Sequence, residues 1–172
     1  MSTETSGHDE PRWTLPPRKE ISPENLHISS FVIVRNEIGD EGESILLLRA
    51  GDKHPLSFRR GKLMLPSVIL RYGENPREGA RRVLRDQLKD PKDLHDPEFF
   101  SMQSYLGAHW DIVFLFNSRQ NEGAQDPIAK EPYVEAAFYE VKNLPRSEIV
   151  EDHLEVIDGA LNPTDDCLEV KG

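Results

Sequence analysis

Short segments rich in apolar and β-branched residues recur along the chain, and each predicts an extended strand. They are residues 27–35, 44–49, 62–70, 98–105, 110–117 and 133–141. The first two flank an acidic, glycine-containing segment, 37–43, so we expect them to form an antiparallel hairpin. In the last segment Ala136 and Phe138 alternate with Ala137 and Tyr139, which places the two pairs on opposite faces of a sheet.

Two other segments have apolar residues at helical spacing. The first spans residues 76–89, where Asn75 suits the N-cap and Pro76 the first helical position. Glu78 lies where its carboxylate can reach back to that cap. The second predicted helix begins at Ser147. Its apolar side is formed by Ile149, Val150, His153, Leu154 and Ile157.

This order of elements predicts an α/β (α+β) fold, with a mixed sheet, one helix in the middle of the chain and one at the end. The chain's 172 residues are enough for a single domain with its own core. We assign that domain to residues 26–161. Residues 1–25 have little apolar material and predict a flexible N-terminal segment, and residues 162–172 predict an acidic C-terminal tail.

The chain shows no sign of export or membrane insertion. The N-terminal segment lacks an apolar signal region, and no apolar run approaches the ~20 residues that a membrane span needs. Its one cysteine, Cys167, excludes an internal disulfide framework. We therefore expect a cytoplasmic protein.

The segment that leads into the first helix carries the most specific motif. Residues 65–89 read LPSVILRYGENPREGARRVLRDQLK. This run resembles the Nudix box, G-x5-E-x7-R-E-U-x-E-E-x-G-U, where U is a bulky aliphatic residue. Glu74 and Arg82 match the first Glu and the Arg of the box, and Leu84 matches the U. The resemblance implies a Nudix-type α/β/α sandwich with a mixed β-sheet.

The box departs from the family pattern at the residues that would hold a metal ion. Val68 replaces its first Gly, and Val83 replaces the Glu that follows the Arg. The paired glutamates become Asp86 and Gln87, and the closing Gly becomes Lys89. Magnesium prefers several hard oxygen ligands. Asp86, the remaining carboxylate of the stripe, therefore predicts a weak metal site, if any.

Two interpretations of the degenerate box stay open. In the one we favour, Glu74, Arg82 and Leu84 keep a structural role. The protein is then a non-catalytic or weakly catalytic Nudix-like module without a cofactor, which binds a phosphorylated, nucleotide-type ligand or a protein partner. In the other, the protein is an active Mg-dependent pyrophosphohydrolase acting on a nucleoside diphosphate linked to another moiety. Asp86 would then act with carboxylates from elsewhere, Glu131 or Glu135. A purely structural subunit is a third interpretation.

Charge is distributed unevenly along the chain. The net charge is −10, yet residues 49–92 contain twelve Lys/Arg and only five Asp/Glu. This excess predicts a surface that attracts phosphate, because the guanidinium group can hold phosphate oxygens bidentately. The candidate ligand-binding residues are Arg59, Arg60, Lys62, Arg71, Arg81 and Arg85. The alternative is a solvated surface balanced by acidic neighbours.

The remaining expectations concern partners and single residues. The acidity of the chain outside residues 49–92 leads us not to favour nucleic acid as a partner. The resemblance implies a homodimer, since Nudix proteins often form dimers. The six histidines show no metal-ligand spacing, so we expect no zinc site. We expect Trp110, at the start of a strand, to lie in the core.

Overall fold

The computed structural model describes residues 26–37, 42–106 and 110–162. The proposed N-terminal segment and residues 163–172 of the proposed C-terminal tail lie outside this part of the chain. The strands are β1 (Leu26–Glu37), β2 (Glu43–Ala50), β3 (Leu63–Met64), β4 (Ser67–Ile69), β5 (Glu98–Leu106), β6 (Trp110–Arg119) and β7 (Tyr133–Glu140). The α-helices are α1 (Pro76–Gln87) and α2 (Glu151–Leu161). Short 3-10 turns are η3 (Ser57–Arg59), η4 (Pro91–Asp93), η5 (Val141–Asn143) and η6 (Arg146–Glu148).

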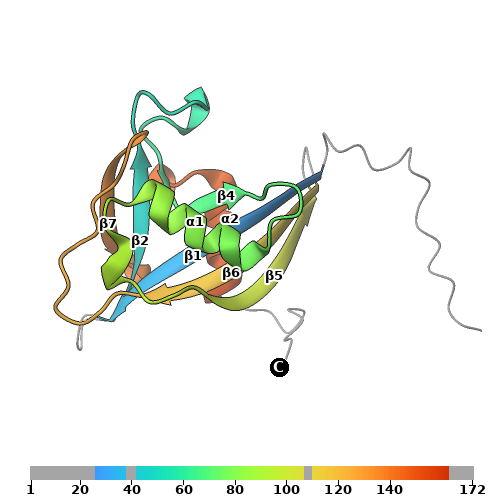
Figure 1. Ribbon diagram of the computed structural model, residues 1–172. Helices are drawn as coiled ribbons and strands as arrows, with labels where there is room; N and C mark the ends of the chain where they lie inside the picture. Colours follow the sequence, from blue (N-terminus) through green and yellow to red (C-terminus); the bar gives the residue numbers. More distant parts are fainter. Residues whose placement is uncertain (1–25, 38–41, 107–109, 163–172) are drawn as a thin grey trace, which may run out of the picture.

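The strands form one mixed sheet that splits into two halves. Its main path is β3-β2-β1-β6-β5, with β4 paired to β1 and β7 paired to β2. β1 and β2 pair only near their hairpin, from Arg35↔Ile45 to Glu37↔Glu43. Beyond it β1 runs parallel to β6, whereas β2 runs antiparallel to β7. β3 and β4 enter the split, because β3 pairs with β2 and β4 pairs with β1 (Figure 1).

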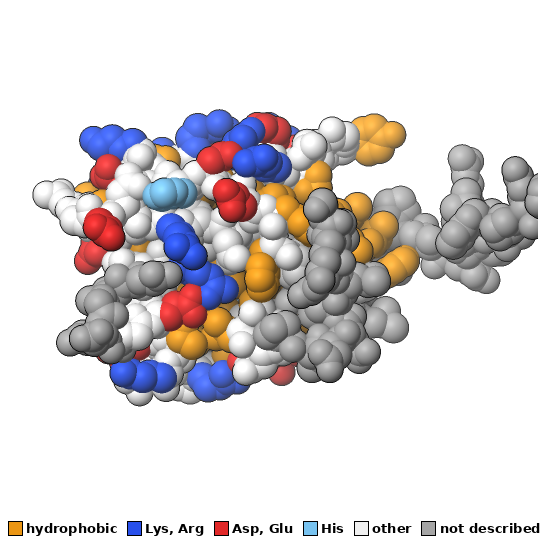
Figure 2. Space-filling model, turned by 90° about the horizontal axis from the view of Figure 1, so that it is seen from below, with side chains coloured by type: hydrophobic (Ala, Val, Ile, Leu, Met, Phe, Trp, Pro, Cys, Tyr) orange, Lys and Arg blue, Asp and Glu red, His pale blue; other side chains and the backbone are white. Residues whose placement is uncertain are grey.

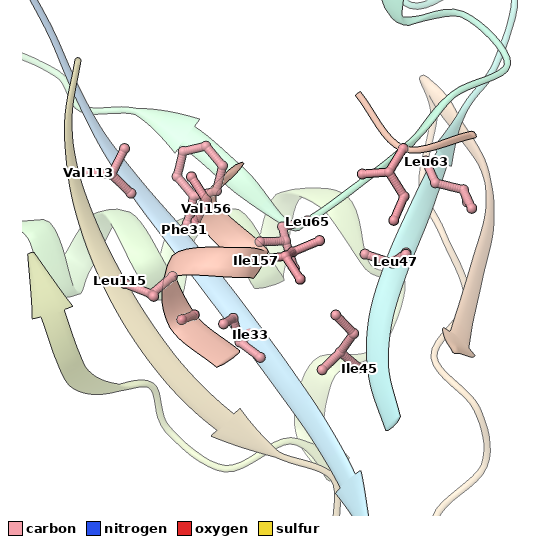
Figure 3. Close-up of a cluster of buried hydrophobic side chains, with 12 residues drawn as sticks. Phe31, Ile33, Ile45, Leu47, Leu63, Leu65, Val113, Leu115, Val156 and Ile157 are labelled. Carbon is pink, nitrogen blue, oxygen red and sulfur yellow. The ribbon is translucent and has the colours of Figure 1, made fainter. Parts of the chain in front are cut away.

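Each face of the sheet packs against one helix, which confirms the predicted α/β/α sandwich. Figure 1 shows α1 in front of the sheet and α2 behind it. Because side chains alternate along a strand, Ile33 and Leu47 belong to the α2-side core, and Val32 and Leu48 belong to the α1-side core. Figure 3 shows the α2-side cluster, in which Ile157 of the helix meets side chains from the strands.

The predicted strands and the first helix are confirmed, with differences at their ends. The extended segment 62–70 is divided at Leu65-Pro66 into β3 and β4. Helix α2 begins at Glu151 rather than at Ser147, because the preceding backbone is held by β3. Ile149 forms a parallel bridge with Leu63, and the Val150 amide donates to the Leu63 carbonyl at 3.0 Å.

The prediction that Trp110 lies in the core is wrong. Its side chain is 40% exposed, and its indole Nε1 donates to the Ser104 hydroxyl at 2.8 Å. Among the described residues, no helix has both the length and the apolar character required to span a membrane.

A buried histidine fixes α2 to the chain between β3 and β4. His153 is fully buried, and its Nδ1 accepts the backbone N–H of Leu65 at 3.1 Å. Nδ1 is therefore unprotonated and the ring proton resides on Nε2, which is buried without a partner among the described residues. Burial lowers the pKa of His153 to about 4.

We predict that protonation of His153 destabilises the fold in mild acid. The unfolded chain binds this proton below its ordinary pKa of 6.5, whereas the folded chain binds it only near pH 4. The free energy of unfolding should therefore fall as pH drops from 6.5 to 4, by roughly 3 kcal/mol at the limit. Urea unfolding across this window should show the slope in the wild type and lose most of it in His153→Gln. His95→Gln, at an exposed position, serves as the matched control and should keep the slope.

Candidate functional site

The turn before α1 is joined to the helix by a shielded ion pair. Arg82 Nε donates to Glu74 Oε1 at 2.6 Å, and Arg82 Nη2 donates to Glu74 Oε2 at 2.7 Å. The two side chains are only 12% and 13% exposed. Arg82 also donates to the Ile69 carbonyl at 3.2 Å, and the Arg71 amide donates to Glu74 at 2.8 Å. The pair thus connects β4, the turn and α1.

This environment holds Glu74 in its ionised form. Hydrogen bonds from the Arg82 guanidinium and from the Arg71 amide lower the pKa of Glu74 to about 2. The start of α1 is fixed separately, since Asn75 Oδ1 accepts the Arg77 amide at 2.9 Å. Leu84, the third box residue, is buried in the α1-side core. Both charges of the pair are satisfied by each other and by the backbone.

The helix positions that correspond to the metal ligands of the box pattern are occupied here by side chains that pack or form hydrogen bonds. Val83 is 1% exposed and belongs to the α1-side core. Gln87 Nε2 donates to the Ser67 carbonyl at 2.9 Å and to the Tyr133 hydroxyl at 3.2 Å. Gln87 Oε1 is buried with no hydrogen-bond partner among the described residues. The Gln87 amide is therefore bonded to the Ser67 carbonyl oxygen, which could otherwise be a ligand to a cation.

Asp86 lies on the solvent side of the same helix. Its side chain is 53% exposed, and its nearest cationic partner is Arg85, whose Nε lies 3.6 Å from Oδ1. Asp86 is thus a single exposed carboxylate, and its neighbours on the stripe are Val83 and the hydrogen-bonded amide of Gln87. This set of side chains does not match the oxygen-rich shell that magnesium requires. Within the described residues, no group of three or more His, Cys, Asp or Glu side chains is placed to hold a metal ion.

The other two candidate carboxylates are engaged elsewhere. Glu131 pairs with Lys53 at 3.0 Å, and both side chains are more than three-quarters exposed. Glu135 accepts from Arg49 Nε at 2.7 Å and from the Tyr139 hydroxyl at 3.2 Å. The Arg49 contact holds the pKa of Glu135 below its usual range. Its neighbour Ala136 packs against the α1-side core, so alternation along β7 directs Glu135 to the α2 side.

The structure places the basic candidates in several different environments. Arg59 pairs with Asp152 at 2.7 Å, and Lys62 Nζ donates to the Ser147 carbonyl at 3.0 Å. Arg60 Nε donates to the His54 carbonyl at 3.0 Å. Arg81 is held by Glu78 and Asp96, and Arg71 contributes its backbone amide to Glu74. Acidic residues from other segments thus offset much of the charge, and Figure 2 shows both signs interspersed on one face.

A groove of about 1120 Å³ opens on the α2 side of the sheet. Apolar side chains from the strands and the helix line it: Phe31, Ile69, Val113 and Val156. Arg59 and Lys62 line it where α2 begins, and the Arg59–Asp152 pair lies there. His27 and Asp111 line it where β1 and β6 begin, joined at 3.2 Å. Glu151, Asp152 and Glu155 also line it there, so the groove combines an apolar lining with a region of both charges and a separate His–Asp pair.

Of the residues that line this groove, only Arg59 and Lys62 were among the candidates predicted from the sequence. Arg59 and Lys62 were candidates because of local charge, whereas Arg60, Arg71, Arg81 and Arg85 are not among its lining residues. Its apolar residues look like ordinary strand and helix residues in the sequence. Nothing in the alternation of β4 indicates that Ile69 would be 60% exposed.

Comparison with known proteins identifies the fold. No family model and no curated protein matches the sequence. The structure resembles the Nudix domain of Shewanella oneidensis NrtR complexed with ADP ribose, with a TM-score of 0.60 at 15% identity, covering 85% of this chain and 92% of that chain. It also resembles a Nudix hydrolase from Nitrosomonas europaea, with a TM-score of 0.57 at 16% identity, covering 81% and 74%.

A third similar structure is an Ap4A hydrolase from C. elegans, solved as a binary complex, with a TM-score of 0.53 at 13% identity, covering 67% of this chain and 81% of that chain. The chain therefore has the Nudix fold, as the box resemblance implied.

We predict that the Glu74–Arg82 pair contributes measurably to stability. Glu74→Gln leaves the guanidinium without its counter-charge in a shielded position and should lower the free energy of unfolding by roughly 2–3 kcal/mol at pH 7. Because the pKa of Glu74 is about 2 when folded and 4.5 otherwise, this contribution is present above pH 4.5 and is lost as pH falls toward 2. Glu78→Gln, on the exposed side of α1, should cost under about 0.5 kcal/mol. Equal effects of the two substitutions in urea unfolding would contradict the assignment.

We also predict that a carboxylate is unfavourable at position 87. Gln87→Glu removes the donor to the Ser67 carbonyl and sets an anion beside that oxygen, which should destabilise the fold by about 1–3 kcal/mol. Asp86→Asn changes one charge at the neighbouring exposed position and should shift the free energy of unfolding by less than about 0.5 kcal/mol. Thermal unfolding in EDTA measures both. A Gln87→Glu variant as stable as the wild type would show that the amide contacts contribute little.

Proposed function

We propose that this Nudix-fold chain is a binding module for a phosphorylated, nucleotide-type ligand and does not hydrolyse it through the box. The observation that carries the proposal is the state of the helix stripe, in which Val83 is buried and the Gln87 amide is bonded to Ser67 and Tyr133. Hydrolysis of a diphosphate by a metal ion depends on polarising it and on generating a nucleophile from water. The residues of the stripe do not fit that ion.

The groove on the α2 side is the proposed binding surface. Its apolar middle, from Phe31 to Val156, can contact the face of a base, and a ligand site of this kind needs only a few placed polar groups. Arg59 and Lys62 would hold the phosphates, and Arg59 would leave its pair with Asp152 to do so. Asp111 can accept hydrogen bonds from hydroxyl or amino groups.

The structural relatives support this class of ligand. The NrtR domain is complexed with ADP ribose, and the C. elegans protein is an Ap4A hydrolase. Both ligands join phosphates to nucleosides, which suits a groove with an apolar lining and the cationic side chains of Arg59 and Lys62. Arg60, Arg71, Arg81 and Arg85 would act on such a ligand only through the long-range field, since they lie outside the lining.

A magnesium-dependent pyrophosphohydrolase is the second candidate function. It is favoured by one observation, the exposed Asp86 carboxylate on the box helix. Glu131 and Glu135 would have to leave Lys53 and Arg49 to assist it. A protein partner in place of a nucleotide is a further outcome that the same measurements distinguish.

We predict that ADP-ribose binds in EDTA and that Arg59 contributes to the affinity. Isothermal titration calorimetry on the full chain should give a dissociation constant that Arg59→Gln raises by roughly ten- to a hundred-fold, the effect of losing hydrogen bonds to a charged group. Arg85→Gln, which removes the same charge outside the groove, should bind like the wild type.

Two outcomes would contradict the proposed function. The absence of binding with ADP-ribose, ADP and diadenosine tetraphosphate would favour a protein partner or a structural subunit. Magnesium-dependent release of phosphorylated products that disappears in Asp86→Ala would establish the hydrolase.

A further inference from the structure

Large apolar side chains are exposed together along the groove on the α2 side of the sheet. Leu56 is 43% exposed, Phe58 66% and Ile69 60%, and all three line the groove. Two further aromatic side chains, Phe31 and Tyr105, line it as well. Apolar residues gathered on one surface in this way mark an interaction site more often than scattered apolar residues do.

Acidic side chains predominate among the charges of this groove. Four Asp/Glu and two Lys/Arg line it. Asp111 and Asp152 have partners within the groove. Glu151 and Glu155 are exposed on the first two turns of α2, and neither forms an ion pair with another described residue. These two carboxylates can therefore attract the cationic groups of an occupant.

The chain itself contains a segment with matching chemistry. Residues 12–21 read RWTLPPRKEI, with three Lys/Arg and one Glu. The large apolar residues of the segment are Trp13, Leu15 and Ile21. Its two consecutive prolines restrict the backbone to extended conformations, and extended proline-containing segments bind in grooves lined with aromatic side chains. The segment therefore complements the groove in apolar character and in charge.

The start of β1 lies at the groove. The described part of the chain begins at Leu26, and the next residue, His27, already lines the groove. β4 pairs with β1 at Ser29↔Ile69, so the beginning of β1 and the exposed Ile69 lie side by side (Figure 1). The segment that precedes β1 is thus joined to the groove through the chain.

This segment is long enough to cross the groove. Residues 13–25 are thirteen residues, which span up to roughly 40 Å when extended. His27 and Phe31, which line the groove along β1, are four residues apart and therefore about 13 Å apart along the strand. Ser22 and Pro23 suit the first two positions of a type I turn, so the sequence predicts a reversal of the chain just before β1.

We propose that residues 12–21 bind in the groove of their own chain and cover it. Trp13 and Leu15 would contact the exposed apolar side chains, and the Lys/Arg of the segment would pair with Glu151 and Glu155. The contact is intramolecular, so it does not depend on protein concentration. The segment would compete with the nucleotide for the apolar lining, a consequence that rests on the proposed function, whereas the docking itself does not.

The fluorescence of Trp13 tests the docking in the full chain. The sequence has two tryptophans, and Trp110 does not line the groove, so Trp110→Phe leaves Trp13 as the single indole. Its emission maximum should lie at shorter wavelength than in urea, and acrylamide should quench it less, because apolar contacts shield the indole from water. Ile69→Ser should move the emission toward that of the unfolded chain. Ile128→Ser, at an isoleucine that is also 60% exposed but lies outside the groove, should leave it unchanged.

Calorimetry with ADP-ribose separates this inference from the proposed function. A segment that covers the groove in roughly nine molecules out of ten lowers the apparent affinity about ten-fold, so Trp13→Ala should bind ADP-ribose about ten-fold more tightly than the wild type. If ADP-ribose binds neither chain, the proposed function fails and the emission of Trp13 still decides the docking. Equal affinities, with Trp13 shielded in a way that depends on Ile69, would contradict the proposed nucleotide site and leave the docking in place.

Three results would overturn the docking. Trp13 emission that matches the unfolded chain would show that the segment does not occupy the groove. Equal emission in Ile69→Ser and Ile128→Ser would show that Trp13 is shielded elsewhere. Shielding that is lost on dilution would show that the occupant is a second copy. Circular dichroism and the melting temperature establish that each variant is folded, which substitution at an exposed position allows.

Discussion

The contact between the Gln87 amide and its two acceptors decides what the box helix can do. At the end of α1, this side chain joins the helix to β4 through the Ser67 carbonyl and to β7 through the Tyr133 hydroxyl. The same end of the helix is held by backbone contacts, since the Lys130 amide donates to the Gln87 carbonyl at 2.8 Å. The neutral Gln87 amide therefore donates hydrogen bonds where α1 meets β4 and β7. A cation bound at this place would instead need oxygen ligands directed toward it. The geometry needs no metal ion to hold these elements together.

The two faces of the sheet consequently differ in character. On the α1 face, the Glu74–Arg82 pair and the buried Val83 make the box a structural unit that positions β4. β4 in turn contributes Ile69 to the groove on the α2 face, where His153 fixes the helix against Leu65. The box therefore positions β4, which forms one side of the groove. The charged side chains of the groove come from residues outside the box.

The sequence was informative where the determining contacts are local. The cap at Asn75, the period of α1 and the spacing of Glu74 and Arg82 are readable from adjacent residues, and the resemblance supplied the sandwich. The start of α2 was misplaced because Leu63, far earlier in the chain, holds Ile149 in an extended bridge. Trp110 was expected in the core because it begins an apolar strand, yet at this end of β6 it is 40% exposed and its indole donates to Ser104. The partner of Gln87 in β7 and the pairing of Glu135 with Arg49 depend on tertiary contacts that no local pattern encodes.

Binding of manganese, measured by electron paramagnetic resonance, tests most directly whether the box still holds a metal ion. Free Mn²⁺ gives a six-line signal that weakens when the ion is bound, and manganese accepts the same carboxylate and carbonyl ligands as magnesium. Titration of the purified chain without nucleotide should leave the signal of the free ion unchanged. A saturable loss of signal with one ion per chain, abolished in Asp86→Asn, would contradict the account.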